Sequence, residues 1–316
     1  MKLIFLSCLV LLSVLLVRCE KEPASPLAEE QLYDVHFTVK GFTVEDVEMQ
    51  NAQPENTGPA GSYLTDIDFF LYDDAGDLLS LTKQDDRIPA GNPNVCCYGE
   101  NHYRLAEGNY KLIVVGSFGN LRYLDSANYA TARLAPVMVA PGGVVVPEIK
   151  DIFYKELDFV VDADEIVDTL EIERLVGQLE VRLQETTDDL WRDARMTYLN
   201  VVEFPFSKDR NPKTERLILP LVSGQVEPWK NIELVFRGYV LPDKSGSFVT
   251  EPYIEVFGPG LNILFDHTFE DVVVNPNRKV IVSGTLTGYS NQQNFYVLAD
   301  SAFADTTYME VNENYR

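Results

Sequence analysis

Short segments rich in β-branched and aromatic residues, bounded by turn residues, run through most of this 316-residue chain. Apolar and polar residues alternate within many of them, and this period of two places one side of a strand in a core and the other side in solvent. Such strands do not alternate with long helical patterns, as they would in a parallel α/β fold. The pattern therefore predicts a mainly β protein built from antiparallel sheets.

An acidic stretch at residues 73–77, Asp-Asp-Ala-Gly-Asp, separates two of the expected strands in the N-terminal half. A calcium-binding EF-hand loop alternates its acidic residues and carries a glutamate further on, and this stretch does neither. We therefore expect a hairpin turn with Gly76 in the left-handed conformation. Residues 51–61 and 89–99 have the composition of long surface loops. The expected strands of this half span residues 33–43, 67–72, 78–81, 103–105, 110–117, 144–146 and 152–161.

The C-terminal half repeats this plan of strands and loops, with one expected interruption. Residues 187–196 have a capping hydroxyl, acidic residues in the first turn and an arginine in the last, which predicts a short helix. Trp191 within it is interpreted as a core anchor rather than a ligand platform. The expected strands of this half span residues 177–183, 198–206, 216–221, 232–240, 254–257, 262–265, 280–286 and 295–298.

The acidic stretch at residues 162–173 lies between the two sets of strands. Hydrophobic residues make up 46% of the chain, so each half has enough apolar surface to bury a core. We therefore predict an N-terminal β-sandwich at residues 32–165 and a C-terminal β-sandwich at residues 166–316.

The first 18 residues have the pattern of an export signal. Lys2 precedes an apolar run at residues 3–17 that ends at Arg18 and Cys19. This run is too short for a bilayer span, which needs about 20 apolar residues. The cysteine at the expected cleavage site resembles a bacterial lipoprotein signal, in which the thiol of Cys19 is lipidated and becomes the mature N-terminus. Arg18 departs from the small residue usual there, and the alternative is a plain secretory signal cut elsewhere.

Residues 19–31 are predicted to be a flexible tether, because this segment is charged and contains prolines. Its Cys-Glu-Lys-Glu start resembles the signal that sends lipoproteins of the Bacteroidetes to the outer face of the outer membrane. The expected location is thus the cell surface, with Cys19 embedded in outer-membrane lipid.

The chain is strongly acidic. Its net charge of −23 becomes −25 once residues 1–18 are removed, because they carry Lys2 and Arg18 and no acidic residue. Nucleic acids and anionic lipid headgroups would repel such a surface. We therefore expect no nucleic-acid partner.

The sequence contains no recognisable catalytic or metal-binding constellation. His36, His102 and His267 are scattered without metal-ligand spacing, and no nucleophile elbow or Walker loop occurs. The adjacent Cys96 and Cys97 fall short of the four ligands of a structural zinc site and are interpreted as buried or loop thiols. We expect no enzyme, no metal and no cofactor, although the two carboxylates of a glycosidase come together only in the fold.

Four segments together resemble the fimbrillins and fimbrial anchor proteins of the Bacteroidetes. Residues 173–181 read Glu-Arg-Leu-Val-Gly-Gln-Leu-Glu-Val, and residues 66–78 form a strand, acidic turn and strand. A Gly-x-Tyr strand at residues 105–116 and an Asn-rich turn with a strand at residues 274–286 follow the same family's order and spacing. Gln178 stands where a lysine is common.

The resemblance implies two transthyretin-like antiparallel β-sandwiches in tandem and a role in pilus assembly. Strand addition needs unpaired backbone groups at a sheet edge and no catalytic residue. Polymerising subunits of this family are trimmed after an arginine near the N-terminus, which frees an edge. No arginine occurs between Cys19 and Arg87. The resemblance therefore implies an anchor or terminating subunit whose partners are fimbrial pilin subunits.

The C-terminal segment is the candidate for pairing with a pilin strand. Phe295, Tyr296, Val297 and Leu298 form a short expected strand after a polar turn. The alternative is that this strand completes its own sandwich. A second function class also stays open, a surface glycan-binding lipoprotein of a polysaccharide-uptake system, for which Trp191, Trp229 and the tyrosines would supply aromatic platforms.

Overall fold

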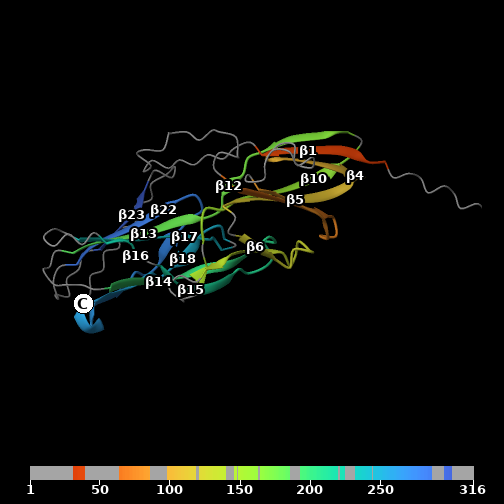
Figure 1. Cartoon of the computed structure of the whole chain (residues 1–316). Helices are drawn as coiled ribbons and strands as arrows, with labels where there is room; N and C mark the ends of the chain where they lie inside the picture. The colour runs from red at the N-terminus through yellow and green to blue at the C-terminus, as the bar shows by residue number, and fades with distance from the viewer. Residues whose placement is uncertain are drawn as a thin grey trace, which may run out of the picture.

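The computed structural model describes the chain in segments separated by short gaps. These segments are residues 31–39, 64–85, 98–118, 121–139, 146–147, 149–162, 164–185, 193–219, 221–224, 232–243, 245–286 and 295–300. They form an elongated stack of β-sheets, with β1 at one end and β23 at the other (Figure 1). No helix among them is long and apolar enough to cross a membrane.

Two sheets lie at the end that contains the first strand. β1 is the middle strand of a three-stranded sheet, antiparallel to β4 on one side and parallel to β11 on the other. A five-stranded sheet lies beneath it in the order β12-β10-β5-β2-β3. The strands are β1 (Tyr33–Val39), β4 (Glu100–Leu105), β11 (Ile166–Leu170), β12 (Glu173–Arg174), β10 (Phe153–Val161), β5 (Gly108–Ser117), β2 (Asp66–Asp73) and β3 (Leu78–Asp85).

A second five-stranded sheet lies at the opposite end, in the order β16-β17-β13-β22-β23. Its central strand β13 is parallel to β22, whereas the other neighbours are antiparallel. The strands are β16 (Leu221–Gly224), β17 (Ile232–Val240), β13 (Gly177–Glu185), β22 (Lys279–Leu286) and β23 (Phe295–Asp300).

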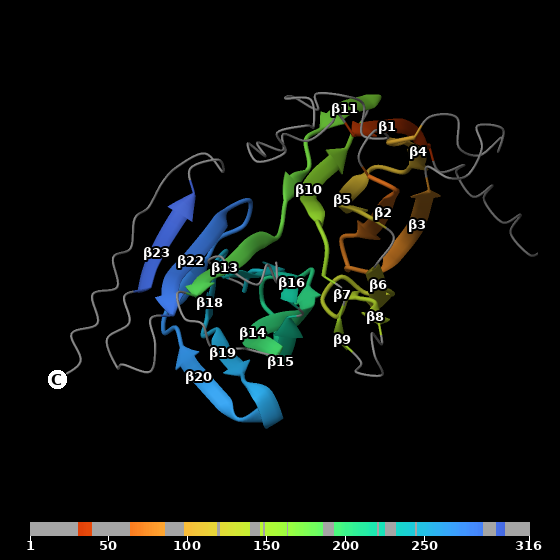
Figure 2. The same cartoon turned by 60° about the vertical axis from the view of Figure 1, so that its left-hand side comes forward.

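A six-stranded sheet packs beneath both of these and joins the two halves of the chain (Figure 2). Its order is β20-β19-β14-β7-β6, and β15 pairs with β14 in addition. Two strand pairs, β18 with β21 and β8 with β9, and the short 3-10 helix η3 complete the fold. The elements are β6 (Leu121–Leu124), β7 (Arg133–Pro136), β8 (Met138–Val139), β9 (Val146–Pro147), β14 (Asp193–Pro205), β15 (Lys213–Leu219), β18 (Phe248–Thr250), β19 (Tyr253–Phe257), η3 (Pro259–Leu261), β20 (Ile263–Thr268) and β21 (Val272–Val274).

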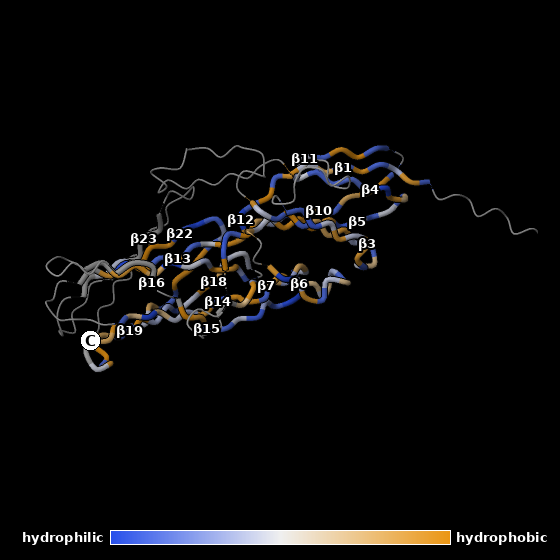
Figure 3. The backbone as a smooth tube through the Cα atoms, viewed as in Figure 1, coloured by the Kyte–Doolittle hydropathy of each residue, from blue (hydrophilic) through white to orange (hydrophobic). Residues whose placement is uncertain are grey.

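The sheet containing β2 and β5 is buried on both faces. Phe69 and Leu71 point toward β1 and join one apolar cluster, whereas Phe70 and Tyr72 join a second cluster on the opposite face. Alternate side chains of a strand point to opposite sides, so an unbroken apolar run is what a middle layer requires. The second cluster continues through Phe206 into the C-terminal half. Orange, hydrophobic segments occur along the strands of each layer in Figure 3.

The structure confirms the mainly β, antiparallel sandwich class that the sequence predicts. Only two strand pairs among the described residues are parallel, β1 with β11 and β13 with β22. The hairpin turn between β2 and β3 is also confirmed. Gly76 has a φ of 82°, and its N–H donates to the carbonyl of Asp73 at 2.9 Å.

The prediction of a helix over residues 187–196 is wrong at its C-terminal end. β14 begins at Asp193, and Ala194 and Met196 are buried while Asp193 and Arg195 are exposed. This alternation belongs to a strand, and pairing with β15 and β19 prevails over the weak local helix signals. Residues 187–192, including Trp191, lie outside the described residues.

The division into sandwiches at residues 165 and 166 stays a prediction, and strand pairing crosses it. β11 lies after this boundary but pairs with β1 along residues 35–39. β7 lies before it but pairs with β14 through Leu134 and Phe204. The two halves therefore share sheets and a core as well as a chain connection.

Candidate functional site

The predicted pairing segment forms the edge of the C-terminal sheet. Phe295, Tyr296, Val297 and Leu298 lie in β23, which pairs with β22 over six consecutive residues without a register shift. The strand is therefore part of its own sheet. Among the described residues, no strand pairs with the other side of β23. Pairing of its outer backbone groups with another chain stays a prediction.

The opposite edge of this sheet is a poorer template. β16 is four residues long, and its pairing with β17 shifts register between Leu221 and Ser223. Short edge strands and bulges are two ways in which proteins prevent further strands from adding to a sheet. Of the two edges, β23 is the one with regular geometry.

The first strand occupies a central position in the opposite sheet. Val35, Phe37 and Val39 are buried. The ring of Phe37 packs edge-on against Phe159 and Tyr103, with centroids 5.2 and 6.4 Å away. β1 is thus bonded on both edges and forms part of the apolar core on one face.

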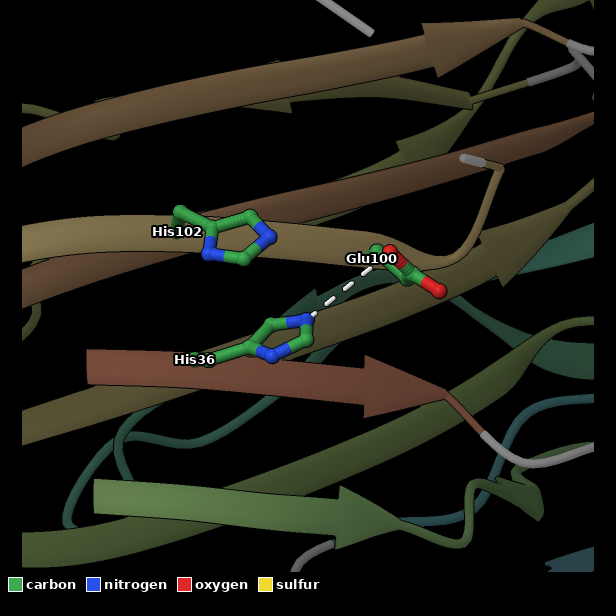
Figure 4. Close-up of side chains that lie close together, drawn as sticks. All are labelled: His36, Glu100 and His102. Carbon is green, nitrogen blue, oxygen red and sulfur yellow. Dashed lines mark ion pairs between the residues drawn. The ribbon is translucent and has the colours of Figure 1, made fainter. Parts of the chain in front are cut away.

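The outer face of the same sheet carries two histidines and a glutamate (Figure 4). His36 on β1 and His102 on β4 are direct cross-strand partners, and their rings stack with centroids 3.8 Å apart. Glu100 precedes His102 by two residues, so it lies on the same face, and its Oε2 is 3.9 Å from Nε2 of His36. One ligand atom from each of the three residues lies within 4.8 Å of the others.

Sequence reasoning missed this cluster because it treated the histidines as scattered. The alternation in β4 does place residues 100 and 102 on one face. The pairing of β1 with β4 in register, which brings His36 opposite His102, has no local sequence signal. His267 lies on β20, in a different sheet. Cys19, Cys96, Cys97 and Trp229 lie outside the described residues.

A second charged cluster stabilises the C-terminal sheet. Glu180 on β13 is fully buried and contacts Arg182, Arg237 and Lys279, with Arg237 Nε 2.6 Å from its Oε2. Burial acts to raise the pKa of Glu180, but hydrogen bonds from the two arginines and the charge of Lys279 outweigh it and lower that pKa below its usual value. Its two carboxylate oxygens are occupied by these cations, so we interpret the cluster as structural.

Several solved structures have the same fold. A proposed adhesin from Bacteroides ovatus is 10% identical with a TM-score of 0.53, and the match covers 89% of this chain and 96% of that one. A proposed polysaccharide-binding protein from Bacteroides thetaiotaomicron is 9% identical with a TM-score of 0.55, covering 88% and 99%. The fimbrial anchor protein Mfa2 from Porphyromonas gingivalis is 11% identical with a TM-score of 0.51, covering 84% and 97%.

The resemblance to fimbrial anchor proteins is therefore confirmed at the level of the fold, over nearly the full length of each chain. No protein-family model matches the sequence, and no curated protein matches it. At identities of 9–11% these likenesses describe the fold. What the chain does has to be argued from its own residues.

Proposed function

We propose that this chain is the lipid-anchored subunit of a cell-surface fimbria and that it binds a pilin by strand pairing. The single observation that carries the proposal is the position of β1 in the middle of its sheet, bonded to β4 and β11. The shared fold with the anchor protein Mfa2 supports it. The proposed role needs no catalytic residue and no cofactor.

A subunit that polymerises by strand exchange has to release a strand to open an edge. Releasing β1 here would expose the side chains of Val35, Phe37 and Val39, each worth about 1.5–3 kcal/mol of burial. It would also break two ladders of backbone hydrogen bonds. No arginine lies between Cys19 and β1 at which trimming could start. A subunit that keeps its first strand suits the end of a fibre.

The anchor itself is Cys19, which is followed by the charged segment 20–31 as a tether to the outer membrane. Lipid chains on this thiol would hold the protein at the cell surface, since an acidic protein has no attraction of its own to anionic lipid. Cys19→Ala should release the protein from the membrane fraction. Cys8→Ala, a change within the export signal, is the matched control and should leave it bound. Equal membrane retention of the two variants would refute the anchor.

The pilin-binding surface is the outer edge of β23. Consecutive residues of an antiparallel strand direct their N–H groups to opposite sides. Of Val297→Pro and Leu298→Pro, one therefore removes a donor toward β22 and the other removes a donor at the outer edge. The outer-edge variant should fold normally, because edge strands tolerate proline there.

The test measures folding by circular dichroism and fibre attachment to cells for both variants. The expected result is that one variant folds as the wild type does yet loses attached fibres. Normal attachment by both folded variants would exclude β23 as the pairing strand, while the membrane release of Cys19→Ala would still test the anchor separately.

A glycan-binding role is the second candidate, favoured by the shared fold with the proposed polysaccharide-binding protein. It predicts binding of surface polysaccharides by the purified protein and no dependence of fibre attachment on β23. A glycan array that shows binding together with unchanged fibre attachment in both proline variants would favour this candidate.

A further inference from the structure

We infer that His36, His102 and Glu100 form a binding site for one divalent transition-metal ion, with Zn²⁺ as the best fit, on the outer face of the sheet that contains β1. The inference stands on the geometry of these three side chains and does not depend on the proposed anchor function. No residue of the site belongs to the surface proposed for pilin binding.

One ligand atom from each of the three side chains lies close to the other two. In Figure 4 the two imidazoles lie one above the other, with Glu100 at the same end of both rings. Zinc binds histidine nitrogen at 2.0–2.1 Å, so tetrahedral geometry requires ligand atoms about 3.3 Å apart. The atoms here lie within 4.8 Å of one another. Binding would require side-chain rotations that bring the ligand atoms about 1.5 Å closer together and turn the two stacked rings out of parallel, so that a nitrogen of each ring points at the ion.

The backbone already holds the ligands in register. His36 and His102 are cross-strand partners, and Glu100 is opposite Thr38, the next residue of β1 on the same face. Two strands bonded to each other bring three donors together before any ion arrives, which reduces the entropy lost on binding. The Oγ1 of Thr38 lies 3.5 Å from Nε2 of His36, within hydrogen-bond distance, and an ion bound at this nitrogen would replace that contact.

The donor set selects the class of ion. Two imidazoles and one carboxylate suit zinc and its neighbours, whereas calcium and magnesium prefer oxygen ligands alone. His102 is exposed, so a fourth position is open to water or to a side chain of another molecule. The acidic character of the chain attracts cations, and the nearby Arg104 is paired with Asp34 at 3.7 Å.

A bound ion would cross-link β1 to β4. Any ligand that binds only the folded state stabilises it, and here the gain would fall on the sheet that contains the first strand. Bound zinc would therefore stabilise the position of β1 in its sheet. Without zinc, only backbone hydrogen bonds and core packing would stabilise it.

The test uses the full chain, purified without a histidine tag and stripped with a chelator. Isothermal titration with ZnCl₂ should show one site, and Co²⁺ should give the visible absorption bands of a tetrahedral complex. His36→Ala and His102→Ala should each weaken zinc binding by more than about tenfold, and Glu100→Gln should weaken it less. His267→Ala is the matched control and should bind as the wild type does.

A second readout removes the ambiguity of a folding defect. Excess zinc should raise the melting temperature of the wild type and of His267→Ala but not that of His102→Ala. The side chain of His102 is exposed, so its removal should leave the protein folded. Absence of zinc binding by the folded wild type would overturn the inference. So would binding of equal strength by the wild type, His36→Ala and His102→Ala.

Discussion

Gly177 lies where β13 begins against the turn between β21 and β22, and no larger residue fits there. A Cβ at this position would lie 2.3 Å from the carbonyl oxygen of Asn275 and 2.5 Å from Cγ1 of Val274. The obstacle is backbone, so Gly177→Ala would have to push the turn away by about 1 Å to restore ordinary contact distances.

That displacement would break two backbone hydrogen bonds across the junction. Gln178 donates to Arg278 at 2.8 Å, and Asn277 donates to Val176 at 2.9 Å. Each is worth about 0.5–1.5 kcal/mol, and overpacking adds about 1–3 kcal/mol. We expect Gly177→Ala to destabilise the protein by about 2–6 kcal/mol, which at roughly 2 °C per kcal/mol for a chain of this size lowers the melting temperature by roughly 4–12 °C.

Differential scanning calorimetry measures this effect directly. Gly108→Ala is the matched control, because the nearest atoms that its Cβ would meet belong to the side chain of Tyr110, at ordinary contact distances of 3.5–3.6 Å. It should melt within about 2 °C of the wild type. If Gly177→Ala also melts with the wild type, the close approach at this junction does not exist in solution and the reasoning fails.

Three further results follow from the core and its charges. The pKa of Glu180 is lowered in the folded state, so the stability that this carboxylate contributes is present above its unfolded pKa and is lost as the pH falls through the folded value. In urea titrations from pH 6 to pH 2, the free energy of unfolding should therefore fall less for Glu180→Gln than for the wild type. Phe37→Ala should cost about 3–5 kcal/mol in urea unfolding at neutral pH, whereas the exposed Val249→Ala should cost less than about 0.5 kcal/mol. Tyr123→Phe removes the hydrogen bond to Asp68, a carboxylate whose pKa burial has already raised, so the pKa of Asp68 measured by NMR should rise further.

Local chemistry explains which parts of the fold could be predicted. A few adjacent residues determine the conformation of the acidic turn with Gly76 and of the apolar strand β2, and both are present in the structure. The residues at the start of β14 carry helix-capping signals, but strand pairing with β15 and β19 decides their conformation. Propensity is a weak prior where a strand has two partners.

Pairing between distant strands explains what could not be predicted. The stacking of His36 on His102 depends on the register of β1 with β4, and the joining of the halves depends on β7 meeting β14. Neither pairing has a signature in the residues that make it, because backbone hydrogen bonds form between any two strands that tertiary packing brings together. The prediction for Cys19 rests instead on a linear export-signal motif, which needs no strand pairing, and it stays a prediction because this residue lies outside the described residues.

The arrangement of strands also determines how the molecule would resist mechanical force. β1 and β23 lie at opposite ends of the elongated stack, and β1 runs along its long axis in Figure 1. In the proposed anchor, tension between the membrane and a fibre attached at β23 would act along β1 and load its hydrogen bonds with β4 and β11 in shear. Bonds loaded in this direction share the force and break together rather than one after another, so the central position of the first strand would give the attachment mechanical strength.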